Sequence, residues 1–281
     1  MDIDLAKFFD RVNHDRLMAR VAERISDRRV LRLIRAFLTA GAFDKEAFVE
    51  TWEGTPQGGP LSPLLSNLVL DELDRELERR GLAFVRYADD CNIYVRSKRA
   101  ARRVMESVAR FLKRRLKLEV NEAKSAVDRP WNRTFLGFTF KSREGFPRAI
   151  AAKALRRFKD RMREATSRHR GVKLETMIKS LNPVLRGWAG YFGFSQNREL
   201  ADLDSWIRRR LRCMLWTQWK TRRRRFHELK RAGLSDKAIY PAIMSAKGPW
   251  RMSSSEALHR ALRNQTFAKR GLVVMARLAP A

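Results

Sequence analysis

Two adjacent carboxylates, Asp89 and Asp90, are the residues of this chain whose placement says most about chemistry. They lie between two short apolar runs, 84–85 and 93–95, which predict two strands joined by a hairpin turn. Neighbouring carboxylates repel each other unless a cation lies between them. Because Mg²⁺ is usually held by one or two carboxylates together with substrate phosphates, the pair suggests a metal-dependent phosphoryl-transfer site. Taken alone, the pair is more typical of a solvated surface turn.

Further segments accompany the acidic pair in a definite order along the chain. Near the N-terminus, Asp4 ends a short apolar run and is followed by the aromatic pair Phe8-Phe9. Residues 56–67 then read Pro-Gln-Gly-Gly-Pro-Leu-Ser-Pro-Leu-Leu-Ser-Asn. Beyond the acidic pair come Leu-Glu-Val-Asn-Glu-Ala-Lys-Ser at 118–125 and Phe-Leu-Gly-Phe at 135–138.

This ordered set resembles the palm motifs of reverse transcriptases, and residues 56–67 are similar to the group II intron branch of that family. The resemblance covers about the first half of the chain. It implies that Asp4 and Asp89 bind two Mg²⁺ ions, with Mn²⁺ as an alternative, and that Asp90 assists as a further ligand. In-line displacement at phosphorus by two metal ions needs carboxylates that converge from separate strands.

Three positions near the N-terminus leave alternatives open. Asp2 and Asp10 compete with Asp4 for the metal on composition alone, and only the family pattern selects Asp4. The resemblance implies that Phe9 packs under the sugar of the incoming nucleotide, while a core phenylalanine is the equally weighted alternative. Because Phe8 is its neighbour, one of the two rings must face the core.

The segment that starts at Gln57 predicts a turn followed by a helix. Gln57 and Gly58 are candidate nucleotide contacts, because paired glycines let the backbone approach a ligand closely. Ser62 is expected to be the helix N-cap, with Pro63 as the first helical residue. We expect the helix to end at Gly81.

Two features follow the acidic pair. A strand is predicted over 116–120, with Lys124 shortly after it. The resemblance implies that Lys124 serves the departing pyrophosphate, and an ordinary surface lysine is the alternative. Gly137 is implied to lie in the hairpin that grips the primer end, where glycine permits close backbone approach.

Bulk composition indicates a globular protein rather than a disordered or membrane-spanning one. At 281 residues with 44% hydrophobic content, the chain predicts two domains. No apolar run approaches the ~20 residues of a membrane span. Two distant cysteines argue against a disulfide framework, and four histidines without a Cys-x-x-Cys argue against zinc. We expect a bacterial-type cytoplasmic protein associated with the nucleoid or with ribonucleoprotein.

Charge is distributed unevenly. Residues 1–140 hold 27 Lys and Arg against 21 Asp and Glu, whereas residues 141–281 hold 34 against 10, a net charge of +24. Such a half predicts nucleic-acid binding. A membrane surface is the competing partner, and the interleaved tryptophans favour RNA over it. Consecutive arginines cannot all face a helical core, so the candidate RNA contacts are Arg208, Arg209, Arg210, Arg222, Arg223, Arg224 and Arg225.

The second half also carries a motif. Apolar residues recur at helical spacing, and residues 182–192 read Asn-Pro-Val-Leu-Arg-Gly-Trp-Ala-Gly-Tyr-Phe. This segment, together with 248–253, resembles the maturase-specific region of group II intron proteins, which implies a helical thumb that binds intron RNA. Trp188, Tyr191 and Phe192 could stack on bases, but their helical spacing favours core packing for most of them.

Together these patterns predict an α+β polymerase palm at 1–148, an antiparallel sheet with packed helices, followed by an α-helical thumb and maturase domain at 149–281. The resemblance implies an RNA-directed DNA polymerase and maturase whose partners are group II intron RNA, an RNA template with a DNA primer, and dNTPs. The alternatives are a non-catalytic RNA-binding splicing cofactor, an inactive relic, and a bacterial reverse transcriptase of another system. Because the sequence starts inside the first motif, we expect the upstream fingers to be missing and stand-alone polymerisation to be poor.

Overall fold

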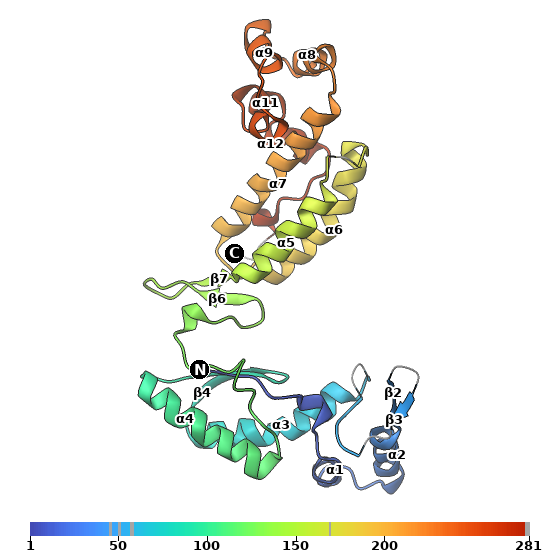
Figure 1. The fold of residues 1–281 in the computed structure, drawn as a ribbon, viewed down its shortest axis with the longest axis vertical. Coiled ribbons are helices and arrows are strands. Elements are labelled where there is room, and N and C mark those ends of the chain that lie inside the picture. The colour runs from blue at the N-terminus through green and yellow to red at the C-terminus, as the bar shows by residue number, and fades with distance from the viewer. Residues whose placement is uncertain (45–46, 50–51, 57–58, 169, 279–281) are drawn as a thin grey trace. The chain divides into compact units, whose positions relative to one another are not determined.

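A three-stranded antiparallel sheet forms the centre of the first of two structural units (Figure 1). The computed structural model describes residues 1–281 except 45–46, 50–51, 57–58, 169 and 279–281. Contacts divide the chain into Met1–Phe135 and Leu136–Ala281. The first unit contains β1 (Asp2–Ile3), η1 (Phe8–Asp10), α1 (His14–Ala22), α2 (Arg28–Thr39), β2 (Ala42–Asp44), β3 (Ala47–Val49), α3 (Ser62–Arg79), β4 (Ala83–Tyr87), β5 (Asp90–Tyr94), α4 (Lys98–Phe111), the π-helical turn η2 (Leu112–Leu116) and η3 (Pro130–Asn132).

The sheet has the order β1-β5-β4, so the N-terminal strand lies directly beside the second strand of the hairpin. In β1, Asp2 and Ile3 pair with Asn92 and Cys91 of β5. β4 and β5 form the predicted hairpin, closed by the pair Tyr87 and Asp90. The pairing therefore brings the two acid-bearing segments together.

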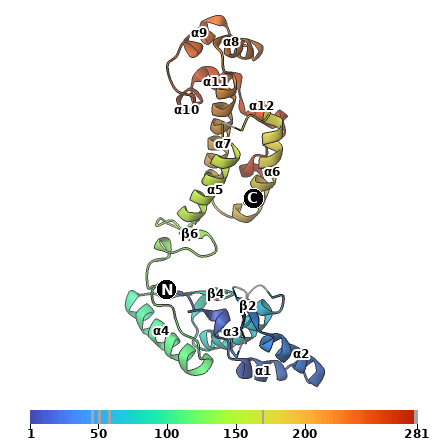
Figure 2. The ribbon, with the colours of Figure 1, turned by 45° about the vertical axis from the view of Figure 1, so that its right-hand side comes forward.

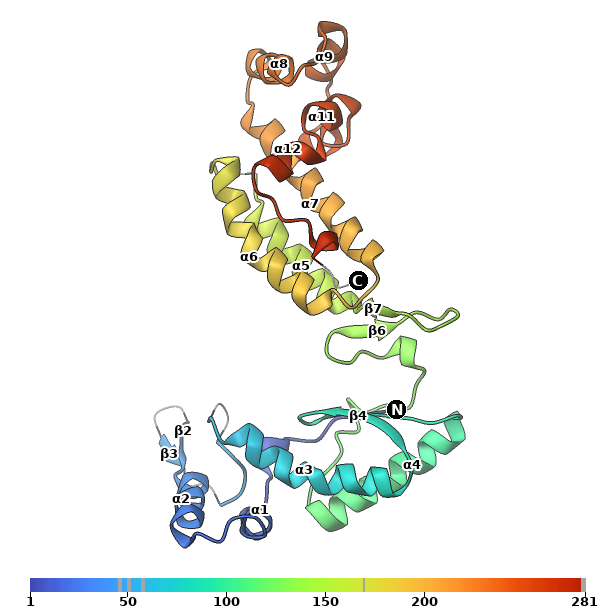
Figure 3. The same cartoon turned by 180° about the vertical axis from the view of Figure 1, so that it is seen from behind.

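Helices α3 and α4 cover one face of this sheet (Figures 1 and 3). Leu70, Leu73 and Leu77 of α3 are fully buried in the same core as Ile93 of β5. This spacing of three to four residues places apolar side chains along one side of the helix. The packing fixes β5, and hence the acidic turn, against a rigid support.

The ends of α3 only partly follow the prediction. The helix begins at Ser62 with Leu61 as its N-cap, one residue earlier than expected. The Ser62 hydroxyl donates to the carbonyl oxygen of Pro56 at 2.5 Å instead of capping the helix. The predicted end is confirmed, because Gly81 has a φ of +63° just after the last turn.

The strand predicted over 116–120 is wrong. Leu112 and Leu116 are buried in the π-helical turn that prolongs α4, and Lys117 then turns the chain with a φ of +57°. Only Val120 makes a bridge, to Leu5. Burial of both leucines against the core favours the helical course over the short extended run that the sequence indicates.

The second unit is helical apart from one short hairpin. It contains β6 (Phe138–Phe140), β7 (Arg148–Ile150), α5 (Ala152–Ala165), α6 (Leu174–Phe192), α7 (Asn197–Gln218), α8 (Arg222–Arg231), α9 (Asp236–Ile243), α10 (Pro249–Met252), α11 (Glu256–Ala261), α12 (Asn264–Lys269) and η4 (Met275–Arg277). Helices α5, α6 and α7 lie side by side around a common apolar core (Figure 2). None of the helices in the described part of the chain is both long and apolar enough to cross a membrane.

The C-terminal segment returns along α6 and α7 and is held there by two polar side chains (Figure 3). Asn182 donates to the Gly271 carbonyl at 2.8 Å and accepts from the Val273 amide at 3.1 Å. Asp204, which is buried, accepts from the amides of Met275 and Ala276, each at 3.0 Å. These bonds satisfy carbonyl and amide groups that would otherwise lose their hydration.

The fold class is confirmed as a mixed α and β unit followed by a helical one. The β6–β7 hairpin makes its contacts with the second unit, so the first unit ends at Phe135. The division into functional regions at 148/149 stays a prediction.

Candidate active site

The acidic turn has an unusual backbone at its tip. Tyr87 and Asp90 pair across the hairpin, which leaves Ala88 and Asp89 as its two turn residues. Ala88 has a φ of +53°, in the left-handed region that residues with a Cβ rarely adopt. A conformation of this kind costs on the order of 1 kcal/mol and persists only where neighbouring contacts hold it.

Arg86 supplies those contacts. Its guanidinium donates to both carboxylate oxygens of Asp74 at 2.7 and 2.5 Å, to Asn67 Oδ1 at 2.9 Å and to the Ala88 carbonyl at 2.8 Å. The paired carboxylate of Asp74 raises the pKa of Arg86, so the cation is permanent. The Arg86 side chain thus ties the turn to α3 and holds the backbone next to Asp89 in place. The sequence analysis did not predict this role of Arg86, although the arginine lies three residues before Asp89 in the same segment.

Asp4 follows β1 directly, at the position where the β1–β5 register continues toward Asp90. Its backbone is held on both sides. The amide donates to Ser125 Oγ at 3.0 Å, and the carbonyl accepts from the Asn121 amide at 2.8 Å. Ser125 and Asn121 lie in the 118–125 motif, so that segment positions Asp4 as well as carrying Lys124.

Lys124 and Arg133 distinguish the competing acids of the N-terminal strand. Lys124 Nζ lies 3.7 Å from Asp4 Oδ2, and the lysine side chain is 68% exposed. Arg133 forms an ion pair with Asp2 and donates to the Lys124 carbonyl at 3.0 Å. Asp2 therefore forms a structural pair with Arg133, whereas Asp4 faces a solvent-exposed lysine.

The electrostatics of the turn show an excess of negative charge. Loss of hydration raises the pKa of Asp90, the charges of Asp89, Asp2 and Asp4 add to that shift, and Lys124 opposes it. The carboxylates are therefore close enough to repel one another. A bound cation would relieve this repulsion.

The candidate metal ligands are carboxylates, the ligand type that Mg²⁺ prefers. Within the described ranges of the chain, no group of three or more His, Cys, Asp or Glu side chains is arranged to hold a metal ion. Mg²⁺ is commonly bound by one or two carboxylates and completed by substrate phosphates and water, so Asp4 and Asp89 remain a suitable pair of ligands. Their carboxylate oxygens are the hard donors that this ion prefers.

The aromatic pair near Asp4 is divided between core and surface. Phe8 is 2% exposed and belongs to the core, whereas Phe9 is only half-buried against it. The two rings meet edge to face with centroids 5.3 Å apart. Phe9 is thus the ring left available for a ligand.

Gly54 brings the loop that precedes Gln57 and Gly58 against Phe9. Its amide donates to the Val12 carbonyl at 2.8 Å, and its φ is +92°. A Cβ at this position would lie 2.8 Å from the Phe9 carbonyl oxygen, so only glycine fits. Sequence reasoning missed Gly54. Gln57 and Gly58 themselves lie outside the residues that the structure describes.

Gly137 lies in a turn that is braced by α6. Its φ is +79°, and a Cβ here would lie 3.3 Å from Phe192 Cζ. Tyr191 Oη donates to the Leu136 carbonyl at 2.9 Å, and the Gly137 carbonyl accepts from the Ala151 amide at 2.8 Å. The end of α6 therefore sets the shape of the turn proposed to grip a primer.

The aromatic residues of the 182–192 segment mostly pack inside the second unit. Trp188 lies between Phe158 and Phe192, with ring centroids 4.2 and 4.3 Å away. Phe192 is buried, while Tyr191 is half-exposed and stacks on Phe138. The preference for core packing agrees with these contacts.

The two arginine clusters differ in their surroundings. Arg209 stacks over the ring of Trp250 at 4.0 Å, and Arg210 Nε donates to Thr166 Oγ1 at 2.5 Å. Desolvation lowers the pKa of Arg208 and of Arg210. By contrast, residues 222–224 are exposed at the start of α8. An RNA role for either cluster stays a prediction, and the second is the more accessible.

Comparison with known proteins connects these features to two families. Residues 1–140 match the family model "Reverse transcriptase (RNA-dependent DNA polymerase)", and residues 155–233 match "Group II intron, maturase-specific domain". The protein YkfC of Escherichia coli is 33% identical over 158 residues, which cover 44% of this chain and 42% of YkfC. The group II intron-encoded protein LtrA of Lactococcus lactis is 39% identical over 83 residues, 30% of this chain and 14% of LtrA.

The chain spans less than half the length of either relative. Among solved structures, a partial Cas6-RT-Cas1–Cas2 complex is 28% identical and covers 40% of this chain and 22% of that chain, with a TM-score of 0.25, too low to define a shared arrangement. The two matched regions occur in the order seen above, with the acidic hairpin in the first and the helical bundle in the second. The chain therefore belongs to the group II intron reverse transcriptase and maturase family, as a reverse transcriptase domain followed by a maturase-specific domain.

Proposed function

We propose that the chain catalyses RNA-directed DNA synthesis and binds group II intron RNA as a maturase. The pairing of β1 with β5 carries the proposal, because it directs Asp4 toward Asp90 in a unit of the reverse transcriptase family. Strands of this sheet supply carboxylates from two separate segments, as nucleotidyl transfer requires. An RNA template with a DNA primer and dNTPs would be its substrates.

Each side chain has a distinct task in this proposal. Asp4, Asp89 and Asp90 would hold two Mg²⁺ ions, or Mn²⁺, which when bound neutralise charge on the reacting phosphate. Lys124, which is exposed beside Asp4, would give a proton or its positive charge to departing pyrophosphate. Phe9 would pack against the sugar of the incoming nucleotide.

The remaining candidate residues would contact the nucleotide, the template, the primer and the RNA phosphates. Gln57 and Gly58 would contact the nucleotide or template. Gly137 would let the primer end approach its turn closely. The exposed arginines at 222–224 and, in part, Arg225 and those at 208–210 would bind RNA phosphates in the strongly basic half of the chain.

Primer extension tests the catalytic part, with the purified chain in excess over the primer and with long incubations, because only weak extension is expected from it. Asp89→Asn keeps the size of the side chain but removes its charge, so we expect extension to be lost while RNA affinity is unchanged. The matched control is Asp15→Asn, an exposed carboxylate in the same unit whose side chain is 84% accessible. Extension by Asp89→Asn at the wild-type rate would overturn the assignment.

A binding measurement separates the enzyme from a purely RNA-binding splicing cofactor. Mn²⁺ titration followed by electron paramagnetic resonance should detect ions bound by the wild-type chain and weaker binding by Asp89→Asn. A splicing cofactor has no physical need for the acidic cluster. Equal Mn²⁺ binding by both proteins, with RNA binding intact, would favour the cofactor.

A further inference from the structure

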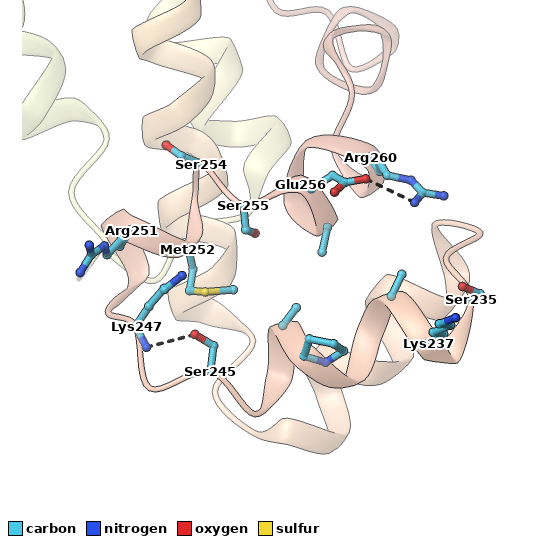
Figure 4. Close-up of a pocket in the computed structure, with 14 residues that line it drawn as sticks. Ser235, Lys237, Ser245, Lys247, Arg251, Met252, Ser254, Ser255, Glu256 and Arg260 are labelled. Atoms are coloured by element: carbon cyan, nitrogen blue, oxygen red, sulfur yellow. Dashed lines mark hydrogen bonds and ion pairs between the residues drawn. The ribbon is translucent and has the colours of Figure 1, made fainter.

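The short helix α10 lies between two hollows of the second unit. Trp250 lines the smaller hollow, of about 240 Å³, while Arg251 and Met252 line the larger, of about 580 Å³ (Figure 4). Because these residues are consecutive, the two hollows are neighbours across a single turn of helix. The larger hollow lies beyond residue 233, where the maturase-specific match ends, whereas the smaller one joins Trp250 to residues inside that match.

In the smaller hollow, which we call the Trp250 pocket, the charged lining residues are all positive. Its charged members are Arg163, Arg168 and Arg210, and no acidic side chain of the described residues lines it. Trp250 is 40% exposed. A cationic hollow with an accessible indole suits a nucleobase whose phosphate lies nearby.

Trp250 is held in position before any ligand arrives. The Arg209 guanidinium lies 4.0 Å from the ring centroid, and it donates to the Trp250 carbonyl at 3.3 Å. The Ser253 hydroxyl donates to the same carbonyl at 2.6 Å. A pre-positioned ring loses little conformational freedom when a base stacks on it, which favours binding.

The larger hollow extends the positive surface past α10. Met252 and Ser255 reach toward its middle, with Lys247 beside Met252 and with Lys237 and Arg260 on the far side (Figure 4). Among the described residues, Lys247 has no carboxylate partner, and Arg260 makes only a 3.7 Å contact with Glu256. Cations that lack such partners are available for phosphate groups.

We infer that α10 is the ridge of a binding site for unpaired RNA. One base stacks on Trp250 in the smaller hollow, and the strand continues over α10 so that its next phosphates meet Arg251 and Lys247. Rigid duplex RNA cannot insert a base into a pocket of this size, so the site selects single-stranded or looped segments. This inference rests on the proposed RNA binding of the second unit and names the kind of RNA it takes.

The test compares RNA affinities of the full chain and its variants by fluorescence anisotropy. Trp250→Leu should weaken binding to single-stranded RNA about tenfold, as expected for loss of one stacked base. The loss should be the same at low and moderate salt, because stacking releases no counterions. Affinity for duplex RNA of equal length should not change.

Charge and ring variants complete the design. Lys247→Gln with Arg251→Gln should reduce the salt slope for single-stranded RNA by about 1.4, since each phosphate contributes about 0.7. Trp250→Phe, which keeps a ring, should retain most of the affinity. The control is Phe194→Leu, an aromatic that is 56% exposed beneath Arg148 in the same unit, and it should bind like wild type.

The outcomes separate this inference from the proposed function. If the wild-type chain binds no RNA, the proposed RNA-binding function fails and this inference fails with it. If the wild type binds but Trp250→Leu is unaffected, or loses single-stranded and duplex RNA equally while remaining folded by circular dichroism, only the pocket is refuted.

Discussion

At the scale of single residues, the charged neighbours of each acid distinguish the candidate ligands better than residue type does. The sequence offered three acids before residue 11 and could not rank Asp2 against Asp4 without the family pattern. In the structure Arg133 engages Asp2 while Asp4 faces Lys124, which favours Asp4, although its role as a metal ligand stays a prediction. It was equally open which of Phe8 and Phe9 faces the core, since that depends on the rotation of a short 3-10 turn.

Asp90 provides a test of this charge placement. Its raised pKa means that the folded chain holds a proton on Asp90 more tightly than the unfolded chain does. The ionised carboxylate therefore costs stability at neutral pH, and the cost fades as pH falls through the raised pKa toward the ordinary value of 3.8. Without divalent cation, Asp90→Asn should unfold at a higher temperature than wild type at neutral pH.

The advantage of Asp90→Asn should disappear in acid and should shrink when Mg²⁺ is added, because the ion relieves the same repulsion. Differential scanning calorimetry across pH measures both effects, with Asp15→Asn as the exposed-carboxylate control. A variant that is less stable than wild type at neutral pH without metal would contradict the argument.

At the scale of elements, local patterns predicted the hairpin and α3 but not the course after α4. The hairpin is set by two apolar runs with a two-residue turn between them, which is local information. The segment 112–118 instead follows the burial of Leu112, Leu116 and Leu118, a tertiary effect that no window of sequence contains. The bonds from Arg86 to Asp74 and Asn67 link the hairpin to α3, so they too were beyond local reasoning.

Arg86→Lys should expose that link. Lysine offers a point charge and cannot reproduce two parallel bonds to Asp74 together with those to Asn67 and Ala88. We expect a loss of about 1–3 kcal/mol in the free energy of unfolding. Urea unfolding measures it, and primer extension should fall as well because the acidic turn loses its brace.

Arg75→Lys is the matched control for this change. It removes another arginine pair on α3, with Asp71 at 3.0 Å, but its side chain is 58% exposed. Exposed pairs contribute little, so the expected change is below about 1 kcal/mol. Equal costs for the two substitutions would show that Arg86 has no special role at the turn.

At the scale of the whole molecule, the charge asymmetry of the sequence identified the half that should bind RNA, but not which arginines face solvent. Several of these arginine side chains contact aromatic rings or donate to carbonyl oxygens inside the second unit. Arg225, for example, donates to the Trp219 carbonyl at 2.9 Å and lies 4.3 Å from the Trp216 ring centroid. Its three predecessors in the sequence are exposed, so the cluster divides into structural and accessible members.

Replacing Arg222, Arg223 and Arg224 by glutamine tests this division. If the three bind phosphates, the slope of log affinity against log salt should become shallower by about 2 for single-stranded RNA, because each phosphate contributes about 0.7. Thermal stability should change little. Within the described residues Arg224 alone of the three pairs with a carboxylate, that of Glu228 at 2.7 Å, and its side chain is 62% exposed. Arg212→Met gives the opposite control: Arg212 is 4% exposed and donates to the Leu262 carbonyl at 3.0 Å, so its loss should lower the unfolding temperature and leave the slope unchanged. An unchanged slope in the triple variant would move the phosphate contacts elsewhere on the basic half.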